Sequence, residues 1–203
     1  MMKKRLMKPP LIVVSAPSGA GKTTLCDRLL QDYPEINYSV SCTTRAPRGA
    51  EEDGIDYFFI TPAEVEARVK KGLFLEHALV HGNRYGTLAG PVREAFAEGQ
   101  SVLMDIDVAG AAQVREYVSN LPEGDPLREG FLDIFIRPPS MEALRERLFN
   151  RGEDAEDVIE TRLRNAEGEL ARAGEYSRCI VNDNLEIAYR EFCDIVDVYA
   201  GIM

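Results

Sequence analysis

The segment APSGAGKTTL, residues 16–25, constrains the fold more than any other part of this sequence. It follows the apolar run LIVVS at residues 11–15, which predicts a buried strand, and residues 22–33 continue with helical spacing of leucines. Gly19 and Gly21 let the backbone curl so that several N–H groups point inward. A strand, such a loop and a helix in this order are typical of a loop that cradles phosphates.

The residues of this loop suit a nucleoside triphosphate. The N-terminus of the following helix adds partial positive charge, Lys22 is expected to reach the β- and γ-phosphates, and Thr23 is expected to offer its hydroxyl to Mg²⁺. Ala16 stands where the pattern has glycine, but the donors of residues 19–23 remain. The predicted ATP-binding residues of the loop are Ala16, Pro17, Ser18, Gly19, Ala20, Gly21, Lys22, Thr23 and Thr24.

Short apolar segments alternate with helical ones along much of the remaining chain. Further strands are expected at residues 101–107, 131–136 and 178–183, and helices at 62–72, 91–99, 108–118, 140–152 with Ser140 as its N-terminal cap, 154–174 and 184–201. This alternation predicts a parallel sheet with helices on both faces. The expected fold class is therefore α/β, with a three-layer P-loop kinase core.

Two segments interrupt the alternation and predict subdomains. Residues 38–90 contain a turn-rich stretch, a strand-like segment at 73–80 and an expected turn at 81–87, and residues 137–172 form Arg-rich helices that suit a mobile lid. The expected core is then about 9–37, 91–136 and 173–203 of a single domain. The polar segment 123–130 is expected to be surface decoration or an assembly contact.

Composition narrows the class of protein. The net charge of −10 argues against a nucleic-acid binder, which would usually present a basic surface. The four cysteines form no CxxC pair and predict free thiols in a reducing cytosol. No apolar run reaches the roughly 18 residues of a membrane span, and the basic, then apolar, start is too short for a signal peptide. We expect a cytoplasmic protein that binds neither nucleic acid nor membrane.

Two segments suggest what receives the phosphoryl group. Arg45 and Arg48 lie three residues apart with Tyr57 nearby, and two guanidinium groups with a phenol hydroxyl suit a phosphate monoester. Glu76 lies in an apolar strand, where a carboxylate needs donors. Guanine offers two adjacent donors, N1–H and the 2-amino group, and the Ser41 hydroxyl can donate to its 6-oxo group. This combination favours guanine over adenine.

Candidate metal ligands are few. Asp105 and Asp107 end the predicted strand 101–107, and strand alternation places both on the same side, where a metal-facing carboxylate would lie. His77 and His81 lie four residues apart, but no third ligand accompanies them, so we interpret both as structural or surface residues. Thr23 and Asp105 are the predicted metal-site residues.

Taken together, the motifs resemble guanylate kinase over essentially the whole chain. They are, in order, SAPSGAGKTTL, SVSCTTRAPR, DGIDYFF, FLEHA, GNRYGT, VLMDIDVAGA, PPSMEALRERLFNRG and IVNDN. The resemblance implies Mg²⁺-dependent, in-line transfer of the γ-phosphoryl group from ATP to GMP without a covalent intermediate, in purine metabolism and GMP recycling. It also implies a core, a GMP-binding region and a lid, with dGMP expected as a second acceptor.

The resemblance further assigns roles to residues. Guanine contacts are expected from Ser41, Glu76 and Asp107, with Thr87 supporting the base site. Phosphate contacts to GMP are expected from Arg45, Arg48, Tyr57 and Tyr85. Asp105 is also expected among the GMP-binding residues and would help to organise Mg²⁺ through water, and Asn182 would lie near the ATP base. The expected catalytic residues are Lys22, Arg45 and the lid residues Arg147, Arg151 and Arg162.

Two alternatives remain open from the sequence. One is a P-loop kinase for another nucleotide or small phosphate acceptor, against which Ser41 and Glu76 argue because both suit guanine. The other is a non-enzymatic interaction module of the same fold, which would be expected to lack phosphate-loop or acceptor-site residues. The oligomeric state is also open, with a homodimer as one arrangement. Ala50 stands where the family often has glycine, which is expected to stiffen that turn.

Overall fold

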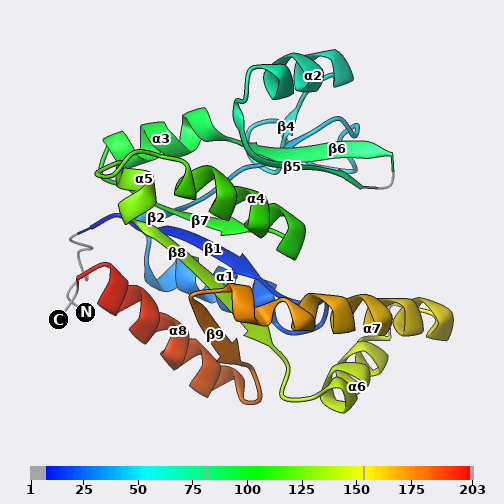
Figure 1. Cartoon of the computed structure of the whole chain (residues 1–203). Coiled ribbons are helices and arrows are strands. Elements are labelled where there is room, and N and C mark those ends of the chain that lie inside the picture. Colours follow the sequence, from blue (N-terminus) through cyan, green and yellow to red (C-terminus); the bar gives the residue numbers. More distant parts are fainter. Residues whose placement is uncertain (1–7, 81, 153, 202–203) are drawn as a thin grey trace.

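The computed structural model describes residues 8–80, 82–152 and 154–201. In these residues the central sheet contains five parallel strands in the order β2-β7-β1-β8-β9 (Figure 1). The strands are β1 Leu11–Ser15, β2 Ile36–Tyr38, β7 Ser101–Asp105, β8 Phe131–Arg137 and β9 Arg178–Val181. The predicted α/β class with a parallel sheet is confirmed. The sequence pattern missed β2, a three-residue edge strand in which only Ile36 is buried.

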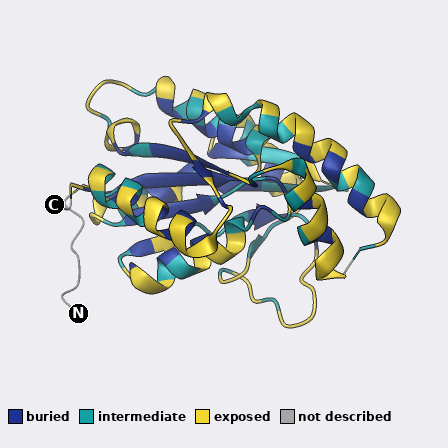
Figure 2. Cartoon of the chain, turned by 90° about the horizontal axis from the view of Figure 1, so that it is seen from below, coloured by how far each residue is buried: buried dark blue, intermediate teal, exposed yellow. Residues whose placement is uncertain are grey.

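Helices cover both faces of this sheet. On one face, α1 (Lys22–Asp32) and α8 (Leu185–Tyr199) pack on Ile12 and Val14. On the other face, α3 (Ala89–Ala97) and α4 (Val108–Ser119) pack on Leu11 and Val13. Successive residues of β1 therefore serve opposite layers, as strand geometry requires. Figure 2 shows the sheet strands largely buried while the helices expose their outer sides.

A second, four-stranded sheet in the order β4-β3-β6-β5 lies beyond α3 and α4 (Figure 1). Its elements are β3 Cys42–Thr43, β4 Phe58–Phe59, α2 Pro62–Lys70, β5 Phe74–Val80 and β6 Asn83–Leu88. Val65 of α2 packs on Cys42 and Phe74 in a small apolar cluster. The Gln113 side chain of α4 bonds to both backbone groups of His77, with distances of 3.1 Å each, and so ties this sheet to the core.

The predicted turn at 81–87 is wrong over most of its length. Residues 83–88 form β6, which pairs antiparallel with β5 from Asn83 opposite Val80 to Leu88 opposite Phe74. Gly82, with φ of +79°, allows the tight reversal. The polar residues that suggested a turn are therefore paired strand residues, and His81 lies outside the described residues.

The segment 123–130 is anchored in the core, so the expectation of surface decoration is wrong. It forms the short helix α5 (Pro126–Glu129), and Leu127 is 1% exposed within the apolar cluster of α3 and α4. Asp125 caps this helix by accepting from the Leu127 N–H at 2.9 Å, and it also pairs with Arg93. The segment is polar and Gly-rich apart from Leu127 and Pro126, so its sequence did not indicate that Leu127 is buried in the core.

Helices α6 (Met141–Arg151) and α7 (Glu156–Ala171) form a separate small apolar cluster around Leu144, Leu148 and Leu163. The predicted cap is confirmed, since the Ser140 side chain accepts from the Ala143 N–H at 3.1 Å. The 3₁₀ helix Ala173–Glu175 then leads into β9. No helix in the described part of the chain is long and apolar enough to cross a membrane. The boundaries of core, GMP-binding region and lid stay a prediction.

We predict that Leu127→Ala destabilises the protein by about 2–5 kcal/mol, because it removes a fully buried leucine side chain from a packed cluster. Urea unfolding followed by circular dichroism measures the change. The matched control is Leu79→Ala, since Leu79 is 66% exposed and its truncation should have little effect. Equal stabilities of the two variants would show that the 123–130 segment does not contribute to the core.

Candidate active site

The loop between β1 and α1 has the backbone that its sequence predicts. Gly19 and Gly21 have φ of +88° and +94°, in the left-handed region that favours glycine. A Cβ at Gly19 would also lie 3.0 Å from a methyl group of Leu148 in α6. Asn182, which follows β9, donates its side-chain amide to the carbonyl oxygen of Ala20 at 2.8 Å. The loop is thus shaped by its glycines and supported from below by a buried amide.

Lys22 begins α1 and forms an ion pair with Asp105 at the end of β7. Both side chains are partly buried. Burial lowers the pKa of Lys22, and the negative charges of Asp107 and Glu169 act in the opposite direction. The ammonium group is therefore held among carboxylates at the carboxyl edge of the central sheet.

A large hollow of about 760 Å³ opens over this loop, in the size range of ligand pockets. The predicted loop residues line it, with the exception of Ala20, and Arg147, Arg151 and Glu169 reach it from α6 and α7. Ala16 is half-buried and packs against the apolar cluster beneath α1. The methyl group of Ala16 therefore contacts the edge of the apolar core.

The three predicted lid arginines lie on this side of the molecule, and two of them touch the segments around the loop. Arg162 donates to the Ser18 hydroxyl at 3.1 Å and to Asp154 at 3.0 Å. Arg147 donates to the Asn182 carbonyl oxygen at 2.7 Å. The Asn182 side chain is buried and its amide is bonded to the loop, so its expected contact with the ATP base stays a prediction.

A second pocket lies between the carboxyl end of β7 and the second sheet. Six of the residues predicted for GMP line it, and Tyr38 and Asp56 join them. The six are Ser41, Tyr57, Glu76, Tyr85, Asp105 and Asp107. Asp105 thus lines this pocket and also pairs with Lys22 of the phosphate loop, so that one carboxylate joins the two sites.

Glu76 is the most deeply buried carboxylate of this pocket, with 7% exposure. Its Oε1 accepts from the Thr87 hydroxyl at 2.8 Å, and the Thr87 and Ser41 hydroxyl oxygens lie 3.4 Å apart. Burial raises the pKa of Glu76, and the negative charge of Asp107 raises it further. The hydrogen bond from Thr87 acts in the opposite direction. The site therefore holds a carboxylate that lacks enough donors of its own, which a ligand with N–H groups would supply.

Asp107 does not lie on a strand, so the predicted extent of the strand 101–107 is wrong, although Asp105 and Asp107 do line the same pocket. Strand β7 ends at Asp105, and Asp107 is the N-cap of α4, where it accepts from the Gly110 N–H at 2.7 Å. A Cβ at Gly110 would lie 3.2 Å from Glu76 Oε2 and 3.4 Å from Asp107 Oδ1. The two carboxylates thus approach each other over a glycine, and the cap rather than the strand orients Asp107.

The two predicted phosphate-binding arginines lie in different environments. Arg45 is 9% exposed, and its two terminal nitrogens donate to Glu51 at 2.8 and 2.9 Å while Nε donates to the Tyr85 hydroxyl at 3.2 Å. Arg48 is exposed, and its backbone N–H also donates to Glu51. These hydrogen bonds lower the pKa of Glu51 to about 2. The carboxylate therefore holds Arg45 in place, a role that the sequence analysis missed.

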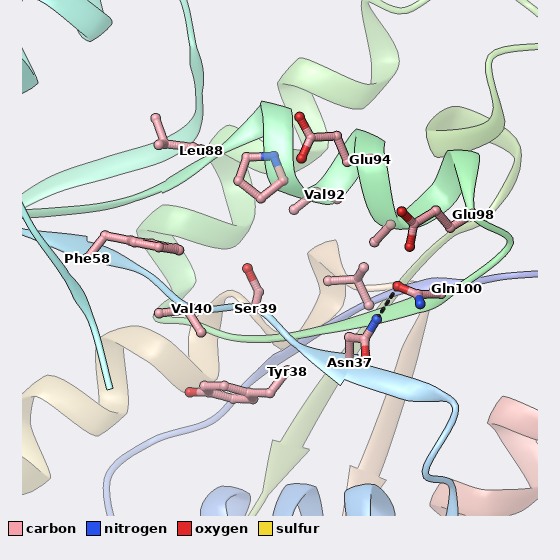
Figure 3. Close-up of a pocket in the computed structure, with 13 residues that line it drawn as sticks. Asn37, Tyr38, Ser39, Val40, Phe58, Leu88, Val92, Glu94, Glu98 and Gln100 are labelled. Carbon is pink, nitrogen blue, oxygen red and sulfur yellow. Dashed lines mark hydrogen bonds between the residues drawn. The ribbon is translucent and has the colours of Figure 1, made fainter. Parts of the chain in front are cut away.

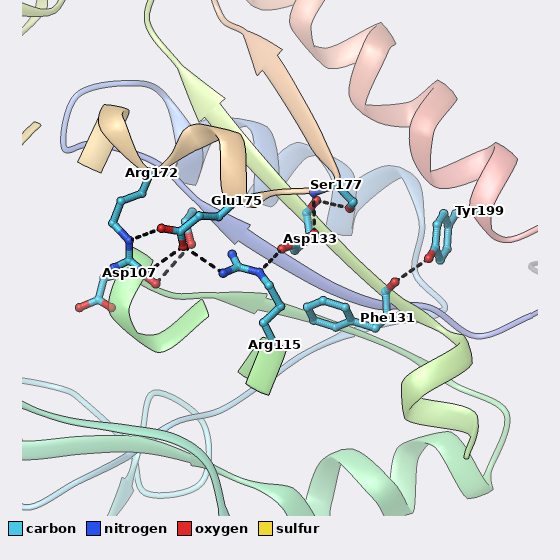
Figure 4. A network of polar contacts seen from close by, with 9 residues as sticks. Asp107, Arg115, Phe131, Asp133, Arg172, Glu175, Ser177 and Tyr199 are labelled. Atoms are coloured by element: carbon cyan, nitrogen blue, oxygen red, sulfur yellow. Dashed lines mark hydrogen bonds and ion pairs between the residues drawn. The ribbon is translucent and has the colours of Figure 1, made fainter. Parts of the chain in front are cut away.

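A polar network behind the site joins the end of α7 to α4 (Figure 4). Asp133 of β8 is buried and accepts from Arg115 Nε and from the Ser177 N–H, both at 2.8 Å. Arg115 also pairs with Glu175 at 3.1 Å, and Glu175 pairs with Arg172 at 3.0 Å. The 3₁₀ helix after α7 is thereby fixed to the helix that begins at Asp107. The polar sequence around these residues gave no sign of this arrangement.

Comparisons with known proteins agree with this geometry. The family model described as guanylate kinase matches residues 8–199. A guanylate kinase of Bacteroides thetaiotaomicron is 41% identical over 191 residues, which cover 94% of this chain and 89% of the relative. One of Thermotoga maritima is 44% identical over 190 residues, with 94% and 87% covered. A crystal structure of guanylate kinase from Anaplasma phagocytophilum matches with a TM-score of 0.69 and 32% identity, covering 95% of this chain and 86% of that one.

The Arg45–Glu51 pair predicts an acid-sensitive region. Because the folded pKa of Glu51 lies below its ordinary value of about 4.3, the pair stabilises the fold above that ordinary value and is lost as pH falls toward about 2. Urea unfolding between pH 2 and 7 should therefore show a difference between Glu51→Gln and the parent protein that shrinks below about pH 4. The control is Glu116→Gln, an exposed carboxylate on α4. A difference between Glu51→Gln and the parent that does not change with pH would contradict the pairing.

Proposed function

Because the chain belongs to the guanylate kinase family, we propose that it transfers the γ-phosphoryl group of ATP to GMP across the space between its two pockets. The observation that carries this proposal is the shared carboxylate. Asp105 pairs with Lys22 of the phosphate loop and also lines the pocket of Glu76. A donor on the loop and an acceptor beside Glu76 would therefore meet at the same edge of the central sheet.

ATP would bind over the loop of residues 16–24. The inward N–H groups and the N-terminus of α1 would hold its phosphates, and Lys22 would exchange its contact with Asp105 for the β- and γ-phosphates. Asn182 is the candidate for the adenine side because it lies directly beneath the loop. Arg147, Arg151 and Arg162 would add positive charge from α6 and α7.

GMP would bind in the pocket of the second sheet. An ionised Glu76 would accept from guanine N1–H and the 2-amino group, Ser41 would donate to the 6-oxo group, and Thr87 would hold the Glu76 carboxylate in position. Asp107 would supply a further acceptor beside Glu76. Arg45, Tyr57 and Tyr85 lie in mutual contact and would bind the phosphate with Arg48, whose exposed side chain is free to approach. Since 2′-deoxyribose presents the same base and phosphate, dGMP is expected as a second acceptor.

The residues around Lys22 fit a magnesium ion. Mg²⁺ prefers oxygen ligands and usually retains several waters, and the exposed Thr23 hydroxyl with the Asp105 carboxylate provides such oxygens. Bound with ATP, Mg²⁺ would neutralise phosphate charge. The described residues contain no group of three or more histidine, cysteine or acidic side chains that could hold a metal ion by itself. Thr23 and Asp105 would therefore hold the ion together with the nucleotide.

The chain's own residues would act by positioning and by charge. Phosphoryl transfer passes through a loose transition state, so aligned substrates and neutralised charge provide most of the rate enhancement. Lys22, Arg45 and the three lid arginines would supply that charge, and α6 and α7 would exclude water. We further propose a GMP-binding region of about 38–90, a lid of about 137–172, and a cytoplasmic enzyme of GMP recycling.

Lys22→Met tests the phosphate loop. Loss of the ammonium group removes a charge that contacts the transferring phosphoryl group, so kcat should fall on the order of 10³-fold or more. A coupled enzymatic assay of ADP release measures turnover, and circular dichroism checks that the variant is still folded. Lys70→Met, at an exposed lysine of α2, is the control and should keep normal turnover. Near-normal turnover of Lys22→Met would remove the loop from the mechanism.

Glu76→Gln tests the acceptor. Hydrogen bonds to charged groups contribute about 1.5–3 kcal/mol, so KM for GMP should rise about tenfold or more while KM for ATP is unchanged. Burial raises the pKa of Glu76, so in the parent enzyme GMP affinity should also fall as pH decreases through that pKa and the carboxylate becomes protonated. Glu76→Gln should lack this pH dependence. A panel of nucleoside monophosphates completes the test, since equal rates with AMP would favour the alternative acceptor.

A further inference from the structure

A third cavity, of about 300 Å³, lies at the junction of the central sheet and the second sheet (Figure 3). The central side contributes Val92 and Ala95 of α3, Val102 of β7, and residues 37–40, which are the end of β2 and the two residues after it. The other side contributes Phe58 of β4 and Leu88 at the end of β6. Its walls therefore come from both sheets, and its shape depends on how the two sheets are placed relative to each other.

The walls have an apolar end and an acidic end. Phe58 and Leu88 lie at one side of the cavity, whereas Glu98 and Gln100 lie at the other (Figure 3). Glu94 of α3 and Glu98, the C-cap residue of that helix, are both exposed and lie four residues apart, and neither forms an ion pair within the described residues. Two like charges at this spacing disfavour each other and attract a cation. The chemistry suits a small molecule with an apolar body and a positively charged end.

The cavity shares two chain segments with the pocket of Glu76. Ser39 and Val40 line the cavity, whereas Ser41 lines the pocket. Phe58 likewise lines the cavity and its neighbour Tyr57 lines the pocket. Because these residues are adjacent in the chain, a shift of either segment moves both sites. Tyr38 lines both of them.

We propose that this cavity is a second ligand site, that it binds a small amphipathic organic cation, and that its occupant weakens GMP binding. The cation would face Glu94 and Glu98, and the apolar body would contact Phe58 and Leu88. The substrates are anionic, so the acidic rim selects against them and separates this site chemically from the two pockets described above.

The direction of the effect follows from the arrangement that an occupant would favour. In this arrangement the terminal nitrogens of Arg45 donate to Glu51. The arginine assigned to the GMP phosphate is thus paired within the protein. A ligand that fits the present cavity stabilises the arrangement with this internal pair relative to the arrangement that binds GMP, so it lowers the affinity for GMP. By linkage, bound GMP lowers the affinity for that ligand by the same factor. The choice of GMP as the coupled ligand rests on the proposed function.

Binding is tested with benzamidinium, which joins an aromatic ring to a planar cation. Titration of the ¹⁵N-labelled protein should shift the amide signals of Phe58, Val92 and Ala95, with a Kd that rises at least fivefold in Glu94→Gln/Glu98→Gln. The matched control is Glu116→Gln/Glu191→Gln, which removes the same charge from exposed sites on α4 and α8. Ala95→Leu, which adds volume to the cavity wall, should abolish binding while the spectrum of the folded protein persists.

Several results would overturn the site. The first is equal affinity for benzoate and benzamidinium. The second is an equal loss of benzamidinium affinity in the control double variant. The third is a set of amide-signal shifts confined to the phosphate loop and the pocket of Glu76. Benzyl alcohol, the neutral probe, should bind more weakly than benzamidinium. Equal affinity of the two probes would remove the role of the acidic rim.

Coupling is tested by calorimetry with GMP present or absent. Saturating GMP should raise the Kd for benzamidinium three- to tenfold, which is within the usual range of coupling between sites. Benzamidinium should raise the Kd for GMP by the same factor. Unchanged benzamidinium affinity would refute the coupling and leave the proposed kinase activity untouched. Failure of GMP itself to bind would contradict the proposed function, since the benzamidinium titration needs no turnover.

Discussion

The parallel pairing of β1 with β7 is the constraint on which the active site depends. Their register places Val14 opposite Asp105, so the loop that follows β1 and the carboxylate that ends β7 emerge at the same edge. Lys22 can reach Asp105 only because these strands are neighbours in the sheet. The loop after β1, the Asp105 carboxylate and the pocket of Glu76 are thereby brought together by the pairing of strands that consist largely of buried apolar residues.

Three cations in and around the two pockets are paired with carboxylates within the protein. Lys22 pairs with Asp105, Arg45 with Glu51, and Arg162 with Asp154. Each pair keeps a cation close to the place where the proposed function puts a phosphate, and ligand binding would then exchange one anionic partner for another. This arrangement explains how a chain of net charge −10 can present cationic groups to anionic substrates. Local pairing, rather than the overall charge, decides what these pockets attract.

The sequence predicts the parts of this molecule in which local pattern and tertiary role agree. The phosphate loop, the buried strands and the Ser140 cap follow from spacing, glycine conformation and helix-end chemistry. It fails where no pattern marks a residue's partner. Glu51 and Glu169 lie in charged segments without distinguishing pattern. Glu51 meets Arg45, six residues before it, through the turns between them, and Glu169 is brought near Lys22 by the fold of the whole chain. The same reason explains β6, whose polar residues become a strand by pairing with β5.

The anchoring of α5 has a practical consequence for protein engineering. Gly124 lies at an open tip, with φ of +83° and no neighbouring atom within 4 Å of a Cβ built there. A reporter peptide or a protease cleavage sequence inserted at this tip would face water. The same insertion a few residues later, between Leu127 and Gly130, would push against the carbonyl oxygen of Pro9, which a Cβ at Gly130 would approach to 2.7 Å. A position that accepts an insertion and a position that does not accept one thus lie only a few residues apart.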